Sequence, residues 1–235
     1  MKLTSLAGPC AWLALAILSF SLSGCTIFGY AAAAVSGDSH VDASYKGLPN
    51  QKCAIMVWAD DGVLNDYHAI QLDAAHGIED KLQQAAKANT EEVANITWVP
   101  AEKILDYQQT HPGLDAEAVE DVAPNLGVTR LIYVEIEAFQ IHANESPDLW
   151  RGTMTATLTV VAVDKGKGKV AYSERDVSAL YPKNCPPEGL PDLEDAVVYR
   201  STVDAFTTEI AKRFIPHDVD VDESTQYLAP TGDVQ

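Results

Sequence analysis

Apolar residues in the first half of the chain follow strand-like and helix-like spacings in turn. Residues 53–59 form a continuous apolar run of strand length, and residues 96–99 form a shorter one. Between these runs, apolar side chains three or four positions apart predict one amphipathic helix over residues 63–88. Its apolar stripe consists of Tyr67, Ile70, Ala74, Ile78, Leu82 and Ala85. A further helix is expected to begin at Pro100, and another to be capped by Asp115.

Alternation with a period of two dominates the second half. Residues 131–141, 151–164 and 170–180 each alternate apolar with polar side chains, which predicts strands. The glycine- and lysine-rich segment 165–169 predicts the turn of a long antiparallel hairpin. A closing helix over residues 192–214 is predicted by a third spaced set of apolar residues. This set consists of Tyr199, Val203, Phe206, Ile210 and Phe214.

These elements predict an α/β (α+β) fold, with a mixed β-sheet, a long antiparallel hairpin and helices packed on one face. Threonines alternate with apolar residues in the first hairpin strand, and two glutamates share a face of the strand before it. We expect this wetter face to stay open to solvent or to a partner. The candidate partner face consists of Thr153, Thr155, Thr157, Thr159, Glu135 and Glu137.

The amino terminus has the features of an export signal. Lys2 precedes a mostly apolar stretch over residues 3–22, and small residues lead to Cys25. The tetrapeptide LSGC ending at Cys25 resembles the bacterial lipobox, which implies that this cysteine becomes the acylated first residue. More than one acyl chain is needed for stable anchoring, and such lipidation supplies it. An uncleaved anchor or an ordinary secretory signal are the alternatives.

The same patterns divide the chain into four parts. Residues 1–24 are predicted to be the lipoprotein signal peptide, and residues 25–50 a flexible tether rich in alanine, glycine and serine. Residues 51–215 are expected to form a single globular domain. Residues 216–235 are expected to form an acidic disordered tail.

Composition narrows the classes of partner. The 235 residues carry a net charge of -18 at pH 7, which argues against binding to nucleic acid and against electrostatic docking on anionic lipid. The membrane would therefore be reached through the lipid anchor. Outside the cytoplasm, Cys53 and Cys185 are expected to form a disulfide, although Cys53 would also suit a buried free thiol.

No reactive constellation emerges from the sequence. His76 lies between Asp73 and Asp80 at helical spacing, but a third firm metal ligand is missing. Serine-hydrolase, zinc-protease and dinucleotide motifs are absent from the sequence as well. We therefore expect no enzyme activity, no metal and no cofactor. Trp58 is expected to pack in the core or a loop.

The order of elements resembles the TolB amino-terminal and CsgG-like domains of the bacterial envelope. The stretches that carry the resemblance are CAIMVWAD in the first strand, NLGVTRLIY at residues 125–133 and VAVDKGKGKVAYSE in the hairpin. It covers roughly residues 51–215. The resemblance implies protein–protein work in the envelope without a catalytic site. The expected function is a lipid-anchored, non-catalytic interaction or assembly module facing the periplasm, bound to an envelope protein. The alternative is an extracytoplasmic ligand binder or hydrolase.

Overall fold

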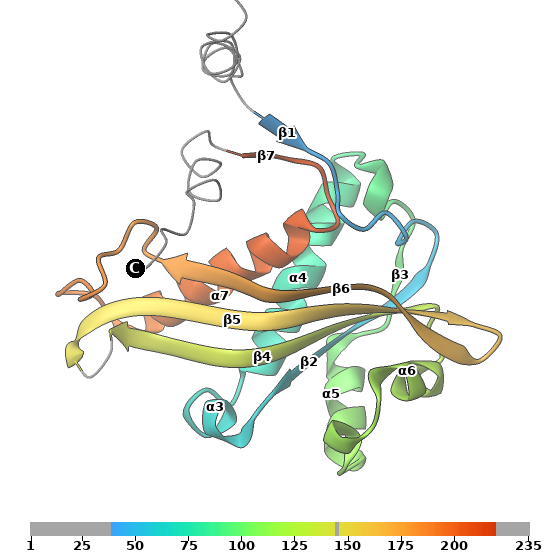
Figure 1. The fold of residues 1–235 in the computed structure, drawn as a ribbon, viewed down its shortest axis with the longest axis horizontal. Helices are drawn as coiled ribbons and strands as arrows, with labels where there is room; N and C mark the ends of the chain where they lie inside the picture. Colours follow the sequence, from blue (N-terminus) through green and yellow to red (C-terminus); the bar gives the residue numbers. More distant parts are fainter. Residues whose placement is uncertain (1–38, 144–145, 220–235) are drawn as a thin grey trace, which may run out of the picture. The chain divides into compact units, whose positions relative to one another are not determined.

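The computed structural model describes residues 39–143 and 146–219 (Figure 1). Cys25, the whole predicted signal peptide and most of the predicted tether and tail lie outside these residues. The chain divides into two units, of which one comprises residues 42–217 and the other the two flanking segments. In the flanking unit, strand β1 (Ser39–Val41) pairs with strand β7 (His217–Val219). The His40 Nδ1 atom lies 3.0 Å from Asp218 Oδ1 in this small sheet.

The larger unit is built on a five-stranded mixed sheet, as the alternating patterns predicted. Its strands lie in the order β3-β2-β4-β5-β6, with β2 parallel to both β3 and β4 and with β4, β5 and β6 antiparallel. The strands are β2 (Lys52–Ala59), β3 (Thr97–Trp98), β4 (Arg130–Ala143), β5 (Ser146–Asp164) and β6 (Lys167–Tyr181). The helices are α3 (Asp61–Asp66), α4 (Ile70–Lys87), α5 (Ala101–Thr110), α6 (Val119–Val122) and α7 (Asp195–Lys212). Short 3-10 turns occupy Glu91–Val93, Leu114–Ala116 and Ala123–Leu126.

The long hairpin β5–β6 closes more tightly than the glycine-rich segment suggested. Asp164 pairs with Lys167, so the turn contains only Lys165 and Gly166. Both have positive φ angles, 49° and 75°. Two-residue turns of this kind match the right-handed twist of the strands they join, which fixes the register of the hairpin.

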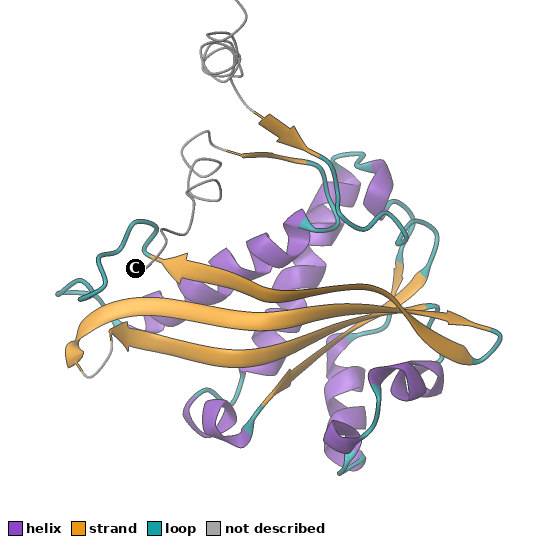
Figure 2. Cartoon of the chain, in the orientation of Figure 1, coloured by secondary structure: helices purple, strands orange, loops and turns teal. Residues whose placement is uncertain are grey.

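Helices α4 and α7 cover one face of the sheet and form the main core with it (Figure 2). Most residues of the predicted stripes are buried. Ile78 and Leu82 of α4 and Phe206 and Ile210 of α7 are each 0% exposed, whereas Tyr67, Ala85 and Tyr199 are half-buried. Burial of side chains of this size contributes about 1.5–3 kcal/mol each. This layer supplies most of the hydrophobic stabilisation.

Helices also cover part of the opposite face, which corrects the expectation that they pack on one face only. Ala54 and Met56 alternate with the main-core residues of β2 and pack with Ile104 of α5 and Val122 of α6. A strand buried on both sides needs apolar residues at successive positions, and β2 has them from Cys53 to Ala59. The second cluster covers only one end of this face.

The predicted helix over residues 63–88 is two helices. α3 ends at Asp66, and α4 begins at Ile70. The break places the Tyr67 ring in edge contact with Phe139, with the centroids 4.5 Å apart. His68 Nδ1 lies 2.9 Å from the Leu64 carbonyl at the same break. Side-chain packing thus ends a helix that spacing alone would have continued.

Part of the predicted tether belongs to the larger unit. The Leu48 side chain is fully buried in the main core, and Ala43 is 6% exposed. The Tyr45 amide donates to the Arg213 carbonyl at 2.9 Å. The folded unit therefore begins before residue 51.

An ion pair fastens strand β6 to the end of α7. Arg213 Nη2 donates to Glu174 Oε1 at 2.8 Å, and its Nη1 donates to Glu209 Oε2 at 3.2 Å. The Tyr172 hydroxyl also donates to Glu174. Partial burial alone would raise the pKa of the Glu174 carboxyl, but hydrogen bonds from Arg213 and Tyr172 outweigh it and lower the pKa.

Candidate functional site

Two features of the larger unit are candidates for a functional site, and they adjoin each other at Trp58. The first is the part of the sheet face that α5 and α6 leave uncovered. The second is a cavity at the carboxyl end of β2. Trp58 lines the cavity and is the register partner of Glu135 on the sheet.

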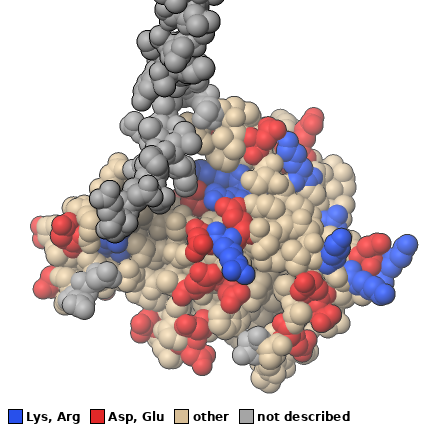
Figure 3. Space-filling view, in the orientation of Figure 1, with Lys and Arg blue, Asp and Glu red and all other residues tan. Residues whose placement is uncertain are grey.

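The open sheet surface is formed by Glu135, Glu137, Thr153, Thr155 and Thr157. The three threonines and Glu135 are half-buried, and Glu137 is exposed. Past Tyr133 along β4, none of the described buried residues of the two hydrophobic clusters lies on this face. Figure 3 shows acidic side chains with basic ones among them over the strands on this side of the molecule.

The threonine row is not uniform along β5. Thr159 is only 8% exposed, because it lies next to the end that α5 and α6 cover, and its Oγ1 lies 3.3 Å from Ser173 Oγ. Thr157 Oγ1 donates to Glu137 Oε1 at 2.6 Å. The register of β4 against β5 shifts between Ile136 and Ala138, so Glu137 lies at a bulge. Bulges re-aim side chains, and this one directs a carboxylate to the neighbouring strand.

The cavity has a volume of about 420 Å³ and lies where β2 meets α3, α4 and α5. Strand β3 pairs only with Lys52 and Cys53, so within the described part of the chain the remainder of β2 has no neighbouring strand on that side. An edge of this kind leaves backbone groups to be satisfied by other means.

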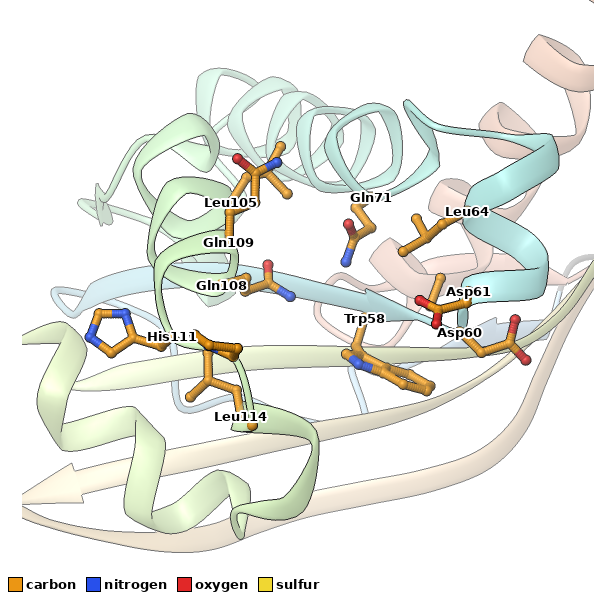
Figure 4. Close-up of a pocket in the computed structure, with 13 residues that line it drawn as sticks. Trp58, Asp60, Asp61, Leu64, Gln71, Leu105, Gln108, Gln109, His111 and Leu114 are labelled. Atoms are coloured by element: carbon orange, nitrogen blue, oxygen red, sulfur yellow. The ribbon is translucent and has the colours of Figure 1, made fainter.

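Two glutamine amides satisfy the Val57 carbonyl at this edge. Gln71 Nε2 of α4 donates to it at 2.9 Å, and Gln108 Nε2 of α5 donates at 3.0 Å. Figure 4 shows the two side chains extending toward each other from opposite helices, with Trp58 below them. Because a carbonyl only accepts hydrogen bonds, the nitrogen of each amide must face Val57. The orientation of both amides is thereby fixed.

Carboxylates stand at the other side of the cavity. Asp60 caps α3, and its Oδ1 accepts from the Val63 amide at 2.8 Å. Asp61 follows in the first turn of α3 and is exposed. His111 also lines the cavity, but its Nδ1 lies 2.9 Å from the Tyr107 carbonyl, and Figure 4 shows its ring turned away from the two glutamines.

The predicted disulfide between Cys53 and Cys185 is wrong, and both thiols are free and buried. Cys53 pairs with Arg130, which pairs with Ala162 of β5, whereas Cys185 Sγ lies 3.7 Å from the Trp150 carbonyl. Positions 150 and 162 lie about 40 Å apart along β5 at about 3.3 Å per residue. A disulfide needs Cα atoms within about 7 Å. Burial raises the pKa of the Cys53 thiol to about 12, against the opposing effect of Arg130.

The histidine and aspartates of α4 do not converge. His76 Nε2 lies 3.1 Å from Glu102 Oε1 of α5, and Asp73 Oδ2 accepts from the Tyr199 hydroxyl at 2.7 Å. Among the described residues, no group of three or more potential ligands is placed to hold a metal ion. None of the helices in the described ranges is long and apolar enough to span a bilayer.

Comparisons with known proteins assign no family. No family model matches the sequence, and no curated protein is significantly similar to it. A PelC dodecamer from Paraburkholderia phytofirmans is 8% identical, with 76% of this chain and 97% of that chain covered and a TM-score of 0.41. Lipoprotein GNA1162 from Neisseria meningitidis is 14% identical, with 68% and 96% covered and a TM-score of 0.35. Hypothetical protein CT253 from Chlamydia trachomatis is 12% identical, with 55% and 72% covered and a TM-score of 0.34.

At these identities and TM-scores the likenesses carry no argument about function. The resemblance to TolB amino-terminal and CsgG-like domains stays a prediction from the sequence. The cavity could hardly be predicted from the sequence, because Gln71 and Gln108 lie 37 positions apart and meet only through the Val57 carbonyl. The pair Asp60-Asp61 directly after a buried strand was its only local signal.

Proposed function

We propose that this chain is a lipid-anchored module of the bacterial cell envelope that binds a partner protein through the open sheet surface. The lipobox ending at Cys25 supports the anchor and a folded unit that faces the periplasm. Binding, rather than catalysis, is the proposed activity. The observation that carries the proposal is the uneven cover of the sheet.

Helices cover one side of the sheet and one end of the other, yet none of the described residues forms a helix over the centre of that second side. Threonine suits such a surface, because its branched side chain is stiff and its hydroxyl both donates and accepts hydrogen bonds. A partner that binds there meets side chains that are already ordered, so little conformational entropy is lost on binding. The flanking glutamates favour a partner with donor or basic groups opposite them.

The proposal is tested by capture from detergent-solubilised envelope with the wild-type chain and two variants. Thr153→Lys combined with Thr155→Lys places two long charged side chains on the open sheet surface. Lys87→Glu, at the end of α4 on the opposite side, is a control that changes the charge by the same amount with the opposite sign. We expect the first variant to lose at least tenfold of any co-purifying protein and the control to retain it, with native circular dichroism in both. Equal capture by all three chains would refute the proposal.

A further inference from the structure

The cavity at the end of β2 presents several hydrogen-bond acceptors. The amide nitrogens of Gln71 and Gln108 are both directed to the Val57 carbonyl, which leaves their Oε1 atoms as the accepting ends. Asp60 keeps its second carboxylate oxygen after capping α3. Asp61 adds another carboxylate.

The charges of the residues that line the cavity also favour a cationic ligand. Among the described residues that line the cavity there are two aspartates and no lysine or arginine. Glu135 lies beside Trp58 on the adjoining strand and adds a third negative charge nearby. An anionic ligand would be repelled here, whereas a cationic ligand would be attracted.

One wall of the cavity is aromatic, and leucine side chains add aliphatic surface to its lining. Trp58 supplies an indole, and Leu64, Leu105 and Leu114 supply apolar surface. Indole is the side chain that attracts cations most strongly through its ring face. A volume of about 420 Å³ lies at the lower end of the range for ligand sites, which suits a side-chain-sized group.

We infer that this cavity binds an alkyl guanidinium or ammonium group, such as the end of an arginine or lysine side chain. Both groups only donate hydrogen bonds, so they complement the carboxylate and amide oxygens at the cavity. The aliphatic stem packs on the leucines, and the cation lies between the indole and Asp61. This inference does not depend on whether a protein binds the open sheet surface.

The test uses the full chain labelled with ¹⁵N at its 4 tryptophans and titrated in detergent. The probe is N-acetyl-arginine amide, and the matched control ligand is N-acetyl-citrulline amide, which replaces the guanidinium by a neutral urea of the same shape. We expect the arginine probe to move the Trp58 indole N–H resonance while Trp98 and Trp150 stay fixed. Trp58→Phe identifies the resonance by its loss.

Two substitutions on α3 separate a specific contact from general charge. Asp61→Asn is expected to weaken binding of the arginine probe about two- to fivefold, the effect of one solvent-accessible ion pair. Asp66→Asn, at the other end of the same helix and not among the lining residues, is expected to leave binding unchanged. Propylguanidinium should reproduce the shift if the cation alone is sufficient.

Three results would overturn the inference. They are equal binding of the citrulline control, equal weakening by Asp61→Asn and Asp66→Asn, and no movement of the Trp58 resonance at the highest soluble probe concentration. Both aspartates are exposed, so these variants are expected to keep the native fold. Circular dichroism provides that check.

Discussion

Replacing Arg213 by methionine should destabilise the folded unit, because Arg213 joins α7 to the strand that borders the open sheet surface. The substitution keeps much of the aliphatic stem and removes the bonds to Glu174 and Glu209. It also leaves the Glu174 carboxylate partly buried without its cation. The loss of stability depends on how deeply the ion pair between Arg213 and Glu174 is buried.

The exposed fractions set the magnitude. The Arg213 side chain is 21% exposed and that of Glu174 is 32% exposed, so the pair is neither buried nor free in solvent. Breaking a fully buried pair costs about 3–5 kcal/mol, and an exposed pair contributes about 0–1 kcal/mol. We expect Arg213→Met to lower the free energy of unfolding by about 2 kcal/mol. For a unit of this size that is a fall in Tm of about 4–8 °C.

The pH dependence follows from the lowered pKa of the Glu174 carboxyl. A carboxyl whose pKa is lower in the folded state stabilises the fold fully above its unfolded pKa, which is about 4.3. That contribution is lost as the pH falls through the lower, folded pKa. The difference between wild type and Arg213→Met should therefore be constant near neutral pH and narrow below about pH 4.3.

Urea unfolding followed by circular dichroism measures both effects. The control is Lys81→Met, which breaks a 2.7 Å pair with Asp204, whose side chain is 74% exposed. This control should lose less than about 1 kcal/mol. Equal losses in the two variants, or a difference from wild type that does not change on acidification, would refute the reasoning.

Three further predictions concern the anchor, the thiols and the packing of α7. A fatty-acid analogue should label the wild-type chain and not Cys25→Ser, and equal labelling would contradict lipidation. Cys53 and Cys185 should both be alkylated in denaturant without reductant. A cross-linked peptide pair in a non-reduced digest would instead show that the disulfide exists. Gly152→Ala should destabilise the fold by about 1–3 kcal/mol, since a Cβ there would lie 3.0 Å from Thr202 Cβ and closer still to its hydroxyl. An unchanged Tm would show that α7 shifts to make room for the added methyl group at little cost in stability.

The periodic segments of the sequence predicted the sheet and its main core because burial itself creates the period. Phe206 and Ile210 are buried because only one stripe of α7 faces the sheet. The same logic should have revealed helices on both faces, since Ala54 and Met56 interrupt any alternation in β2. A continuous apolar strand indicates two covered faces.

Other features depend on contacts that periodicity does not encode. The break at Tyr67 depends on a ring contact with Phe139, which is distant in the sequence. The positions of the two cysteines follow from strand lengths and register, so their separation was not visible from the residues alone. The acceptor-lined cavity depends on two helices meeting over one carbonyl group, Val57. Tertiary geometry, not local pattern, creates such sites.

The open sheet surface as a binding site for a partner protein is tested most directly by photo-crosslinking in intact cells. A photoreactive amino acid replaces Thr155 in one strain and Lys87 in a second, so that the two probes report from opposite sides of the sheet. The proposed function predicts a discrete crosslinked protein of one mass with the probe at position 155 and none with the probe at position 87. The same adduct from both positions, or none from position 155, would contradict it.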